Sequence, residues 1–171
     1  MNGYWEKLKD LLRPKLVARD IYNIDFGKLR QRGIRALLVD IDDTLLPRGV
    51  NDISPQIFEW VMARKEEGFK LCLTSNSYHP IRVKYFGETL GVPAMPLSLK
   101  PLPFAFQRSL KEINARPEET AMIGDQLFMD VLGANLLNIY SIYVKYATPE
   151  GFFLRRWMRW AEDWVLLRLK P

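Results

Sequence analysis

The feature of this sequence that most constrains its fold is a series of short apolar runs at regular spacing. The runs at 34–41, 69–75 and 120–125 are almost continuously apolar, as strands covered on both faces are. The runs at 92–98 and 139–144 are further β-rich stretches. Between the runs lie four segments of helical character: SPQIFEWVMARKEEG, YHPIRVKYFGETLG, PFAFQRSLKEIN and LFMDVLGANLLN. This alternation predicts βαβ units, and therefore a three-layer, doubly wound, Rossmann-like α/β domain around a parallel sheet.

Length and composition fit one such domain. The chain has 171 residues, of which 48% are hydrophobic and 26% charged, so it can bury a core and is not of disordered composition. We expect a single domain over 1–171. It would have a helical lead-in at 1–33, a core at 34–148 and an amphipathic, basic, Trp-rich helix at 149–171.

Cysteine usage and hydropathy indicate the compartment. The single cysteine, Cys72, excludes an intramolecular disulfide framework and a cysteine-based zinc site, and it fits a reducing compartment. No apolar run approaches the roughly 20 residues that cross a membrane, and the N-terminus lacks the apolar stretch of a signal peptide. The sequence thus predicts an intracellular protein, soluble or peripherally bound to a membrane.

Polar side chains collect where the predicted strands end. Ligands of doubly wound folds bind at the carboxyl ends of the strands, so the residues there are the candidates for function. They are Asp40, Asp42 and Asp43 after the first strand, Thr74, Ser75 and Asn76 after the second, Ser98 and Lys100 after the third, and Asp125 and Asp130 after the fourth. Each alone is more readily explained as a turn or cap residue, but their occurrence at all four strand ends favours a functional site.

The residue types predict phosphate chemistry with a metal ion. Clustered carboxylates repel each other unless a cation balances them, and oxygen ligands suit a hard cation such as Mg²⁺. Lys100 and Ser75 could hold the oxygens of a phosphoryl group. Asp40 and Asp42 are two residues apart at a strand end, so one could attack phosphorus while the other acts as general acid and then base.

Four motifs in this order resemble the haloacid dehalogenase (HAD) superfamily of phosphatases. They are DIDDTL (40–45), which matches Asp-x-Asp-x-Thr-Leu after an apolar strand, TSN (74–76), Lys100-Pro101, and MIGDQLFMD (122–130). The fold of that superfamily agrees with the doubly wound domain deduced above. Response-regulator receiver domains also combine acidic residues, a Ser or Thr and a Lys, but they lack the Asp-x-Asp-x-Thr motif.

The resemblance implies a role for each acidic motif residue. Asp40 would be the nucleophile that forms an aspartyl-phosphate, and Asp42 would protonate the leaving oxygen and then activate water. Mg²⁺ would be held by the Asp40 carboxylate, the Asp42 backbone carbonyl and Asp125. Thr44 would support the loop through side-chain hydrogen bonding, and Asp130 would orient the waters of the metal or the lysine of the third motif.

The remaining motif residues would bind the transferring phosphoryl group. The resemblance implies this role for Ser75, Asn76 and Lys100. Thr74 competes with Ser75 as the hydroxyl of the second motif, because a shift of one residue in register exchanges the two.

Many HAD enzymes carry a cap domain, and this chain has no room for one. Only 29 residues separate Leu45 from Ser75 and 24 separate Ser75 from Lys100, so one helix and one strand use up each interval. The site should therefore be open. An open site suits a phosphate displayed on something large, such as a lipid in a bilayer, a protein or a nucleic-acid end. Alternatively, a partner subunit could cover the site as a lid.

One branch of the superfamily is resembled in more detail. The segments IYNIDFGKLRQRGIRALLVDIDDTL and GDQLFMDVLGANLLN look like the capless subfamily IIIA, YqeG-like group, over residues 14–148. That group includes phosphatidylglycerophosphate phosphatases, which produce phosphatidylglycerol. The sequence departs from the group at Asp43, where Asn is usual, and at Met129, where Thr is usual. Two alternatives stay open: a capless phosphatase for a soluble sugar phosphate, nucleotide or phosphoprotein, and a non-catalytic membrane or protein adaptor on the same scaffold.

The charge distribution favours a membrane partner. The net charge of +5 divides into nine basic and four acidic residues in 1–39, eleven and fourteen in 40–150, and five and two in 151–171. Both ends are thus basic. Because a nucleic-acid binder more often carries its basic face on the folded core, we expect no nucleic-acid partner.

The ends of the chain also have an amphipathic pattern. A helical period in the tail places Phe153, Trp157, Trp160, Trp164 and Leu167 on one stripe, and Tyr4, Trp5, Leu8 and Leu12 repeat the theme at the N-terminus. Tryptophan with arginine suits the headgroup region of an anionic bilayer, so we expect a cytoplasmic protein bound peripherally to the inner face of the membrane. The alternative is that both helices pack on the sheet or form a contact within an oligomer.

Overall fold

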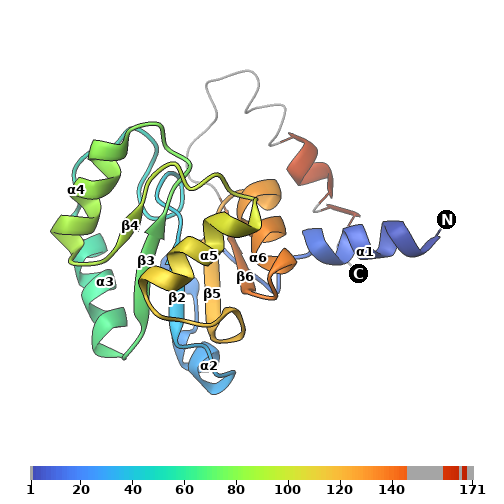
Figure 1. Cartoon of the computed structure of the whole chain (residues 1–171), viewed down its shortest axis with the longest axis horizontal. Helices are drawn as coiled ribbons and strands as arrows, with labels where there is room; N and C mark the ends of the chain where they lie inside the picture. The colour runs from blue at the N-terminus through green and yellow to red at the C-terminus, as the bar shows by residue number, and fades with distance from the viewer. Residues whose placement is uncertain (1, 146–159, 166, 169–171) are drawn as a thin grey trace.

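A parallel sheet forms the centre of the molecule. The computed structural model describes residues 2–145, 160–165, 167 and 168. The strands are β1 (Leu16–Ala18), β2 (Ala36–Val39), β3 (Lys70–Thr74), β4 (Ala94–Met95), β5 (Thr120–Gly124) and β6 (Tyr140–Val144). They stand in the order β1-β6-β5-β2-β3-β4, and every neighbouring pair is parallel (Figure 1). The predicted parallel α/β fold is therefore confirmed.

Helices cover both faces of this sheet and complete three layers. One face carries α2 (Phe26–Gln31), α3 (Pro55–Glu66) and α4 (Pro80–Leu90), and the other carries α5 (Pro103–Glu112) and α6 (Leu132–Leu136). Side chains alternate between the two faces along a strand and so pack into both cores. In β2, Leu37 and Val39 face the first set of helices and Leu38 faces the second. Shorter turns are the 3₁₀ helices η1 (Ile21–Asn23) and η2 (Pro117–Glu119) and the π-helix η3 (Leu127–Val131).

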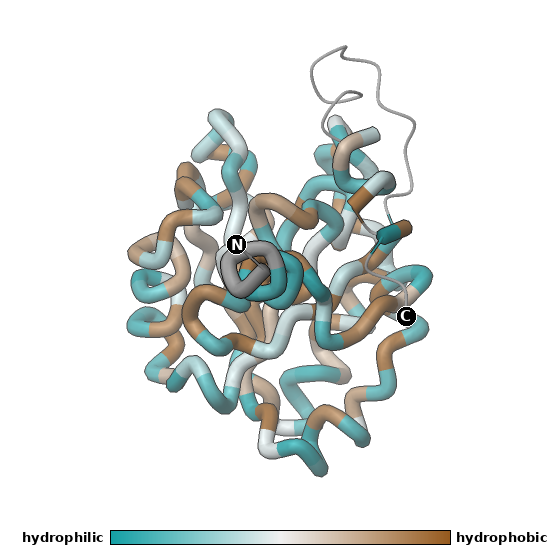
Figure 2. The backbone as a smooth tube through the Cα atoms, turned by 90° about the vertical axis from the view of Figure 1, so that its right-hand side faces the viewer, coloured by the Kyte–Doolittle hydropathy of each residue, from teal (hydrophilic) through white to brown (hydrophobic). Residues whose placement is uncertain are grey.

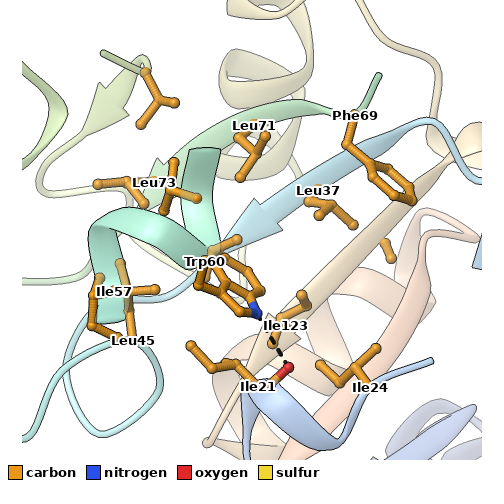
Figure 3. Close-up of a cluster of buried hydrophobic side chains, with 14 of the residues drawn as sticks. Ile21, Ile24, Leu37, Leu45, Ile57, Trp60, Phe69, Leu71, Leu73 and Ile123 are labelled. Carbon is orange, nitrogen blue, oxygen red and sulfur yellow. Dashed lines mark hydrogen bonds between the residues drawn. The ribbon is translucent and has the colours of Figure 1, made fainter. Parts of the chain in front are cut away.

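The larger core lies between the sheet and the layer of α2, α3 and α4. The ring of Phe26 meets Trp60 at 5.7 Å and Phe69 at 5.8 Å between centroids, both edge-on. The indole N–H of Trp60 donates to the carbonyl oxygen of Ile21 at 3.3 Å (Figure 3). This bond satisfies a buried polar group and ties the N-terminal segment to the core.

The lead-in of residues 1–33 contains a short strand besides its helices. That segment does contain α1 (Asn2–Leu12), η1 and α2, but between them Leu16 pairs with Ile142 and Ala18 with Val144, so β1 extends the sheet beside β6. A strand of three residues is too short to show the alternation by which a strand is recognised. Its pairing with β6, and not its own pattern, determines its conformation.

The two ends of the chain pack differently from the core helices. α1 contacts α6 and η3, points outward from the domain in Figure 1, and is seen end-on in Figure 2. Residues 160–165, 167 and 168 of the tail are helical, with Val165 packed against the cluster of Leu127 and Val131. The predicted stripe residues Phe153 and Trp157 lie outside the described residues. Within the described part of the chain, no helix is long and apolar enough to cross a membrane.

Candidate active site

The predicted site residues converge where the strand order reverses. From β2 the chain moves to β3 and β4 on one side and returns to β5 and β6 on the other. Val39, the last residue of β2, pairs with Leu73 of β3 and with Ile123 of β5, so Asp40 follows directly at the carboxyl edge between those strands. A crevice at such a switch point is where doubly wound folds bind their ligands.

The ammonium group of Lys100 lies in a buried ion cluster at this edge. It donates hydrogen bonds to Oδ1 of Asp40 at 2.6 Å and to the carbonyl of Thr74 at 2.8 Å, and it lies 2.7 Å from Oδ1 of Asp130. Burial alone would lower the pKa of Lys100, but the carboxylates of Asp130 and Asp40 outweigh burial and raise that pKa above its ordinary value. The carboxylates therefore favour the ammonium form of Lys100.

Three buried carboxylates face the same point. One oxygen each of Asp40, Asp125 and Asp130 lies within 4.8 Å of the other two, and Oδ2 of Asp40 is buried without a hydrogen-bond partner. Burial, opposed by the attraction of Lys100 and aided by repulsion from Asp130, raises the pKa of Asp40 to about 7. One ammonium group does not balance three carboxylates. The excess negative charge, the oxygen-only donors and the orphaned oxygen fit a divalent cation.

The raised pKa of Asp40 predicts a pH-dependent stability of the metal-free protein. The folded state keeps a proton on Asp40 up to about pH 7, whereas the unfolded chain releases it near the ordinary value of 3.8. The free energy of unfolding should therefore fall as the pH rises from about 4 to about 7 and then level off.

Mg²⁺ should counteract this loss, because the ion competes with the proton for the Asp40 carboxylate. The rise in melting temperature produced by Mg²⁺ should grow across the same pH window. Thermal melts with chelator and with Mg²⁺, at about pH 5 and about pH 8, measure both effects. A metal-induced shift of equal size at both pH values would contradict the expectation.

Asp130 reaches the cluster from an unusual helix. It stands on the π-helix η3, where its backbone N–H donates to the carbonyl of Gln126 at 2.9 Å and its Oδ2 accepts the N–H of Gln126 at 3.1 Å. Single π-turns are frequent at functional sites. A Cβ at position 124 would overlap the Asp130 side chain, so only glycine at Gly124 allows the carboxylate to approach β5 this closely. The Gly-Asp pair of the fourth motif thus has a steric reason.

Three hydroxyl side chains of the motifs have distinct surroundings. Oγ1 of Thr44 donates to Oδ1 of Asp125 at 3.3 Å, which is the kind of contact expected of a supporting residue. Ser75 lines the cavity of the site. Thr74 is fully buried, and its Oγ1 shares a hydrogen bond of 2.9 Å with Oγ of Ser109 in α5. The geometry favours Ser75 over Thr74 as a phosphate-binding hydroxyl.

Asn76 lines the cavity and is also bonded to the loop of Lys100, and its role in phosphate binding stays a prediction. Its side-chain oxygen accepts hydrogen bonds from Oγ of Ser98 at 3.0 Å and from the backbone N–H of Lys100 at 2.9 Å. Its amide nitrogen donates to the carbonyl of Lys100 at 3.0 Å. The Asn76 side chain therefore holds the loop that carries Lys100.

The carboxylate of Asp42 pairs with a residue that sequence reasoning missed. Nη2 of Arg82 lies 2.9 Å from Oδ1 of Asp42. Arg82 also donates to Oδ1 of Asn51 at 3.1 Å and to the carbonyl of Val50 at 2.8 Å, and its guanidinium lies 4.7 Å from the ring centroid of Phe86. Arg82 thus connects α4 to the loop before α3 and fixes Asp42 at the site. No motif distinguishes this arginine from Lys84, the other cation of its helix.

The departure from the family pattern at Asp43 has a structural explanation. Asp43 has φ of 66°, a left-handed conformation that Asn and Asp tolerate better than other non-glycine residues. Its Oδ2 lies 3.0 Å from both Nε and Nη2 of Arg48, and its Oδ1 accepts the backbone N–H of Arg48 at 3.2 Å. Arg48 therefore balances the charge that aspartate adds relative to asparagine.

An open cavity of about 1140 Å³ lies at the ion cluster. The predicted site residues that line it are Asp40, Asp42, Ser75 and Asn76, and its other walls include Arg48, Tyr78, Ile81, Arg82, Tyr85, Met129 and Glu162. Glu162 comes from the tail helix, and its buried carboxylate accepts the backbone N–H of Phe128 at 3.2 Å. The structure describes all of residues 46–99, and α3, β3, α4 and β4 fill that range without an inserted cap.

Comparison with known proteins identifies the family. The chain is 33% identical over 163 residues to the "Probable phosphatase YqeG" of Bacillus subtilis. The aligned region covers 95% of this chain and 94% of that protein. The HAD-hydrolase-like family model matches residues 99–157. The chain belongs to the haloacid dehalogenase superfamily. Within that superfamily, the chain is a phosphatase. A 47-residue stretch, 28% of the chain, is 40% identical to the glyceraldehyde 3-phosphate phosphatase of Pyrococcus furiosus and covers 20% of that enzyme.

Solved structures share the fold. NagD from Escherichia coli K-12 matches with a TM-score of 0.52 and 13% identity over 68% of this chain and 90% of that one. An uncharacterized protein from Corynebacterium glutamicum matches with a TM-score of 0.52 and 19% identity over 75% and 93%. The cobalt-bound deoxy-D-mannose-octulosonate 8-phosphate phosphatase of Haemophilus influenzae matches with a TM-score of 0.50 and 14% identity over 83% and 91%. At these identities the likeness shows the HAD fold alone.

Proposed function

We propose that the protein is a Mg²⁺-dependent phosphatase that hydrolyses phosphatidylglycerophosphate to phosphatidylglycerol. The observation that carries the substrate class is the make-up of the open cavity, which combines Asp40 of the buried ion cluster with two guanidinium groups and an apolar wall. A small soluble phosphate would need a lid to enclose it, and no cap is inserted in the described range 46–99. A large, amphipathic phosphate ester needs none.

In the proposed reaction, the carboxylate of Asp40 attacks phosphorus and the bond to the glycerol oxygen breaks. Asp42 donates a proton to that leaving oxygen and then takes a proton from the water that hydrolyses the aspartyl-phosphate. Lys100 and Ser75 bind the non-bridging oxygens of the phosphoryl group, and Lys100 is held ready for this by its bonds to Asp40 and to the carbonyl of Thr74.

A divalent metal at this site would offset the charge of the phosphoryl group and of the surrounding carboxylates. Asp40 and Asp125 would bind it directly, together with the backbone carbonyl of Asp42, and Asp130 would orient its waters or Lys100. Mg²⁺ is the ion we propose because all these donors are oxygens. The cobalt-bound state of the Haemophilus relative supports a divalent ion in this fold.

The two guanidinium groups support the choice of a lipid that carries two separate phosphate groups. Phosphatidylglycerophosphate carries a phosphodiester beyond its terminal phosphate, so a matching site needs a second cationic region near the reacting one. Arg48 and Arg82 line the cavity and are fixed beside Asp43 and Asp42. Guanidinium groups recognise phosphate oxygens well because their donors form a planar fork.

The tail supports peripheral binding to an anionic membrane on its cytoplasmic face. In its described part, Glu162 and Val165 pack inward, while Trp160, Trp164 and Leu167 are exposed. The guanidinium of Arg168 stacks over Trp164 at 3.9 Å from the ring centroid, which is the pairing of aromatic and cation that suits lipid headgroups. We propose the N-terminal helix as the second lipid contact.

Phosphate release from phosphatidylglycerophosphate in mixed micelles with Mg²⁺ tests the proposal. We expect turnover that a chelator abolishes and that yields phosphatidylglycerol as the lipid product. Parallel assays with glycerol 3-phosphate, a sugar phosphate, a nucleoside monophosphate and a phosphopeptide measure the soluble alternatives. Efficient turnover of one of these, with none on the lipid, would refute the lipid assignment, and no turnover of any ester would favour a non-catalytic adaptor.

A further inference from the structure

Exposed apolar side chains gather beside the open cavity on two neighbouring connections, each made of a loop and the first turn of the helix that follows it. Six of them, which we call the rim surface, are Tyr78 and Ile81 after β3 and Leu97, Leu99, Leu102 and Phe104 after β4. Tyr78 is 84% exposed and Ile81 is 83% exposed, so both project into solvent. Because β3 and β4 are parallel neighbours, both loops leave the sheet at the edge where the site lies (Figure 1). Grouped apolar exposure of this kind marks an interaction surface.

Hydrogen bonds join the two loops into one unit. The backbone N–H of Ser98 donates to the carbonyl of Ser75 at 3.0 Å, and the side chain of Asn76 bonds Ser98 and both backbone groups of Lys100. Tyr78 and Ile81 also line the cavity wall. The rim surface is therefore anchored to the same residues that hold Lys100 in the site, and its position relative to the cavity is fixed.

The loop after β4 holds two leucines outward at a conformational cost. Leu97 has φ of 48° and Leu99 has φ of 63°, in the left-handed region that leucine disfavours. Ser98 and Lys100, which alternate with them, are buried at 2% and 5% exposure. The inward bonds of Ser98 and Lys100 thus fix the leucines in solvent, where Asn would fit the backbone better.

The charge around the rim surface is positive. Residues 76–111 contain five Lys or Arg residues and a single acidic residue, Glu88, although the range 40–150 as a whole has more acidic than basic residues. Of the five cations, Arg82 and Lys100 are paired with carboxylates of the site, and Lys84, Arg108 and Lys111 are exposed. Apolar tips among cations complement a surface that is anionic outside and apolar just beneath.

We propose that the rim surface docks the protein onto an anionic phospholipid bilayer, with its apolar tips among the headgroups and the cavity mouth facing the lipid phosphates. The inference rests on the proposed lipid substrate and assigns it a membrane contact separate from the terminal helices. The six side chains project from two loops and from the first turns of α4 and α5, and a deformable bilayer can accommodate each of them separately. Docking here would bring a headgroup phosphate to the cavity without a cap.

Vesicle binding by a double variant, Leu97→Asn with Leu99→Asn, tests the docking surface in the full-length protein. Neither leucine lines the cavity, and Asn is tolerated at both backbone angles, so the variant should fold with an unchanged or higher melting temperature. Its partitioning into phosphatidylglycerol-containing vesicles without substrate should fall about tenfold. Hydrolysis of p-nitrophenyl phosphate should stay at the wild-type level, and high salt should weaken wild-type binding.

A matched control is Val17→Thr with Leu136→Asn. These residues are 53% and 44% exposed, against 41% and 53% for Leu97 and Leu99, and β1 stands at the opposite edge of the sheet from β4. The control should bind vesicles like the wild type. Equal binding by the Leu97/Leu99 variant and the wild type would overturn the docking surface and leave the proposed function intact.

Two further results separate the remaining explanations. Sedimentation that shows a wild-type dimer and a monomeric Leu97/Leu99 variant would overturn the proposal in favour of contact with a second copy of the chain. The wild type could also bind vesicles, and the Leu97/Leu99 variant bind them less, although neither hydrolyses phosphatidylglycerophosphate. That result would support the docking surface and refute the proposed function.

Discussion

Asp40→Asn should abolish phosphate release while leaving the protein folded and, without metal, more stable. The amide cannot attack phosphorus, so turnover should fall by about 10⁴-fold or more. Burial raises the pKa of Asp40 to about 7, so the ionised carboxylate weakens the metal-free fold above that pH. The neutral amide removes that repulsion, and we expect a gain of about 1–2 kcal/mol in the free energy of unfolding at about pH 8.

The gain should shrink at about pH 5, where the wild-type side chain already carries its proton in the folded state. Urea unfolding in chelator at the two pH values measures it, and phosphate release with Mg²⁺ measures the loss of activity. Residual turnover close to that of the wild type would show that Asp40 is not the nucleophile. A lower stability of the variant at both pH values would contradict the electrostatic explanation.

Asp43→Asn is the matched control, because it makes the same change at a neighbouring carboxylate that is equally buried. Asp40 is 3% exposed and Asp43 is 4% exposed. The Oδ1 of Asp43 accepts the backbone N–H of Arg48 at 3.2 Å, and the side-chain oxygen of asparagine can accept the same bond, so Arg48 should stay at the cavity. Asn also suits the left-handed backbone at this position. We therefore expect activity near the wild-type level, and a loss as large as that of Asp40→Asn would contradict the distinction between the two residues.

The fold was predictable from sequence where strands are buried on both faces. β2, β3 and β5 are three of the four inner strands, so their side chains are apolar on both sides and the runs stand out. The edge strands are harder to recognise. β4 consists of Ala94–Met95 within the longer predicted run, and β1 consists of Leu16–Ala18, so neither has the length to show a period of two. Pairing with the neighbouring strand determines the extended conformation of both edge strands.

The composition of the site was predictable to a similar degree, but side-chain orientations were not. Every motif residue follows a strand end, and parallel strands bring those ends to one edge, so the gathering of Asp40, Lys100 and Asp125 follows from the order of elements. Orientation depends on partners that are remote in sequence. Arg82 turns the carboxylate of Asp42, and the loop of Lys100 turns the amide of Asn76.

Lys100→Met should destabilise the metal-free protein strongly and should do much less harm when Mg²⁺ is present. The substitution leaves the buried carboxylates of Asp40 and Asp130 without the ammonium group that now lies 2.6 Å and 2.7 Å from them. Breaking a buried ion pair by removing one partner costs about 3–5 kcal/mol. A divalent cation supplies positive charge at the same point, so saturating Mg²⁺ should recover a large part of the lost stability.

The exposed Lys111 at the end of α5 provides the control, since Lys111→Met removes the same charge from the surface and should change stability by no more than about 0.5 kcal/mol. Thermal melts of both variants, with chelator and across a Mg²⁺ titration, make the comparison. Activity of Lys100→Met should stay low even when Mg²⁺ restores the fold, because the metal does not replace the ammonium that binds the phosphoryl oxygens. A loss of stability that Mg²⁺ leaves unchanged would mean that the carboxylates beside Lys100 do not hold the ion.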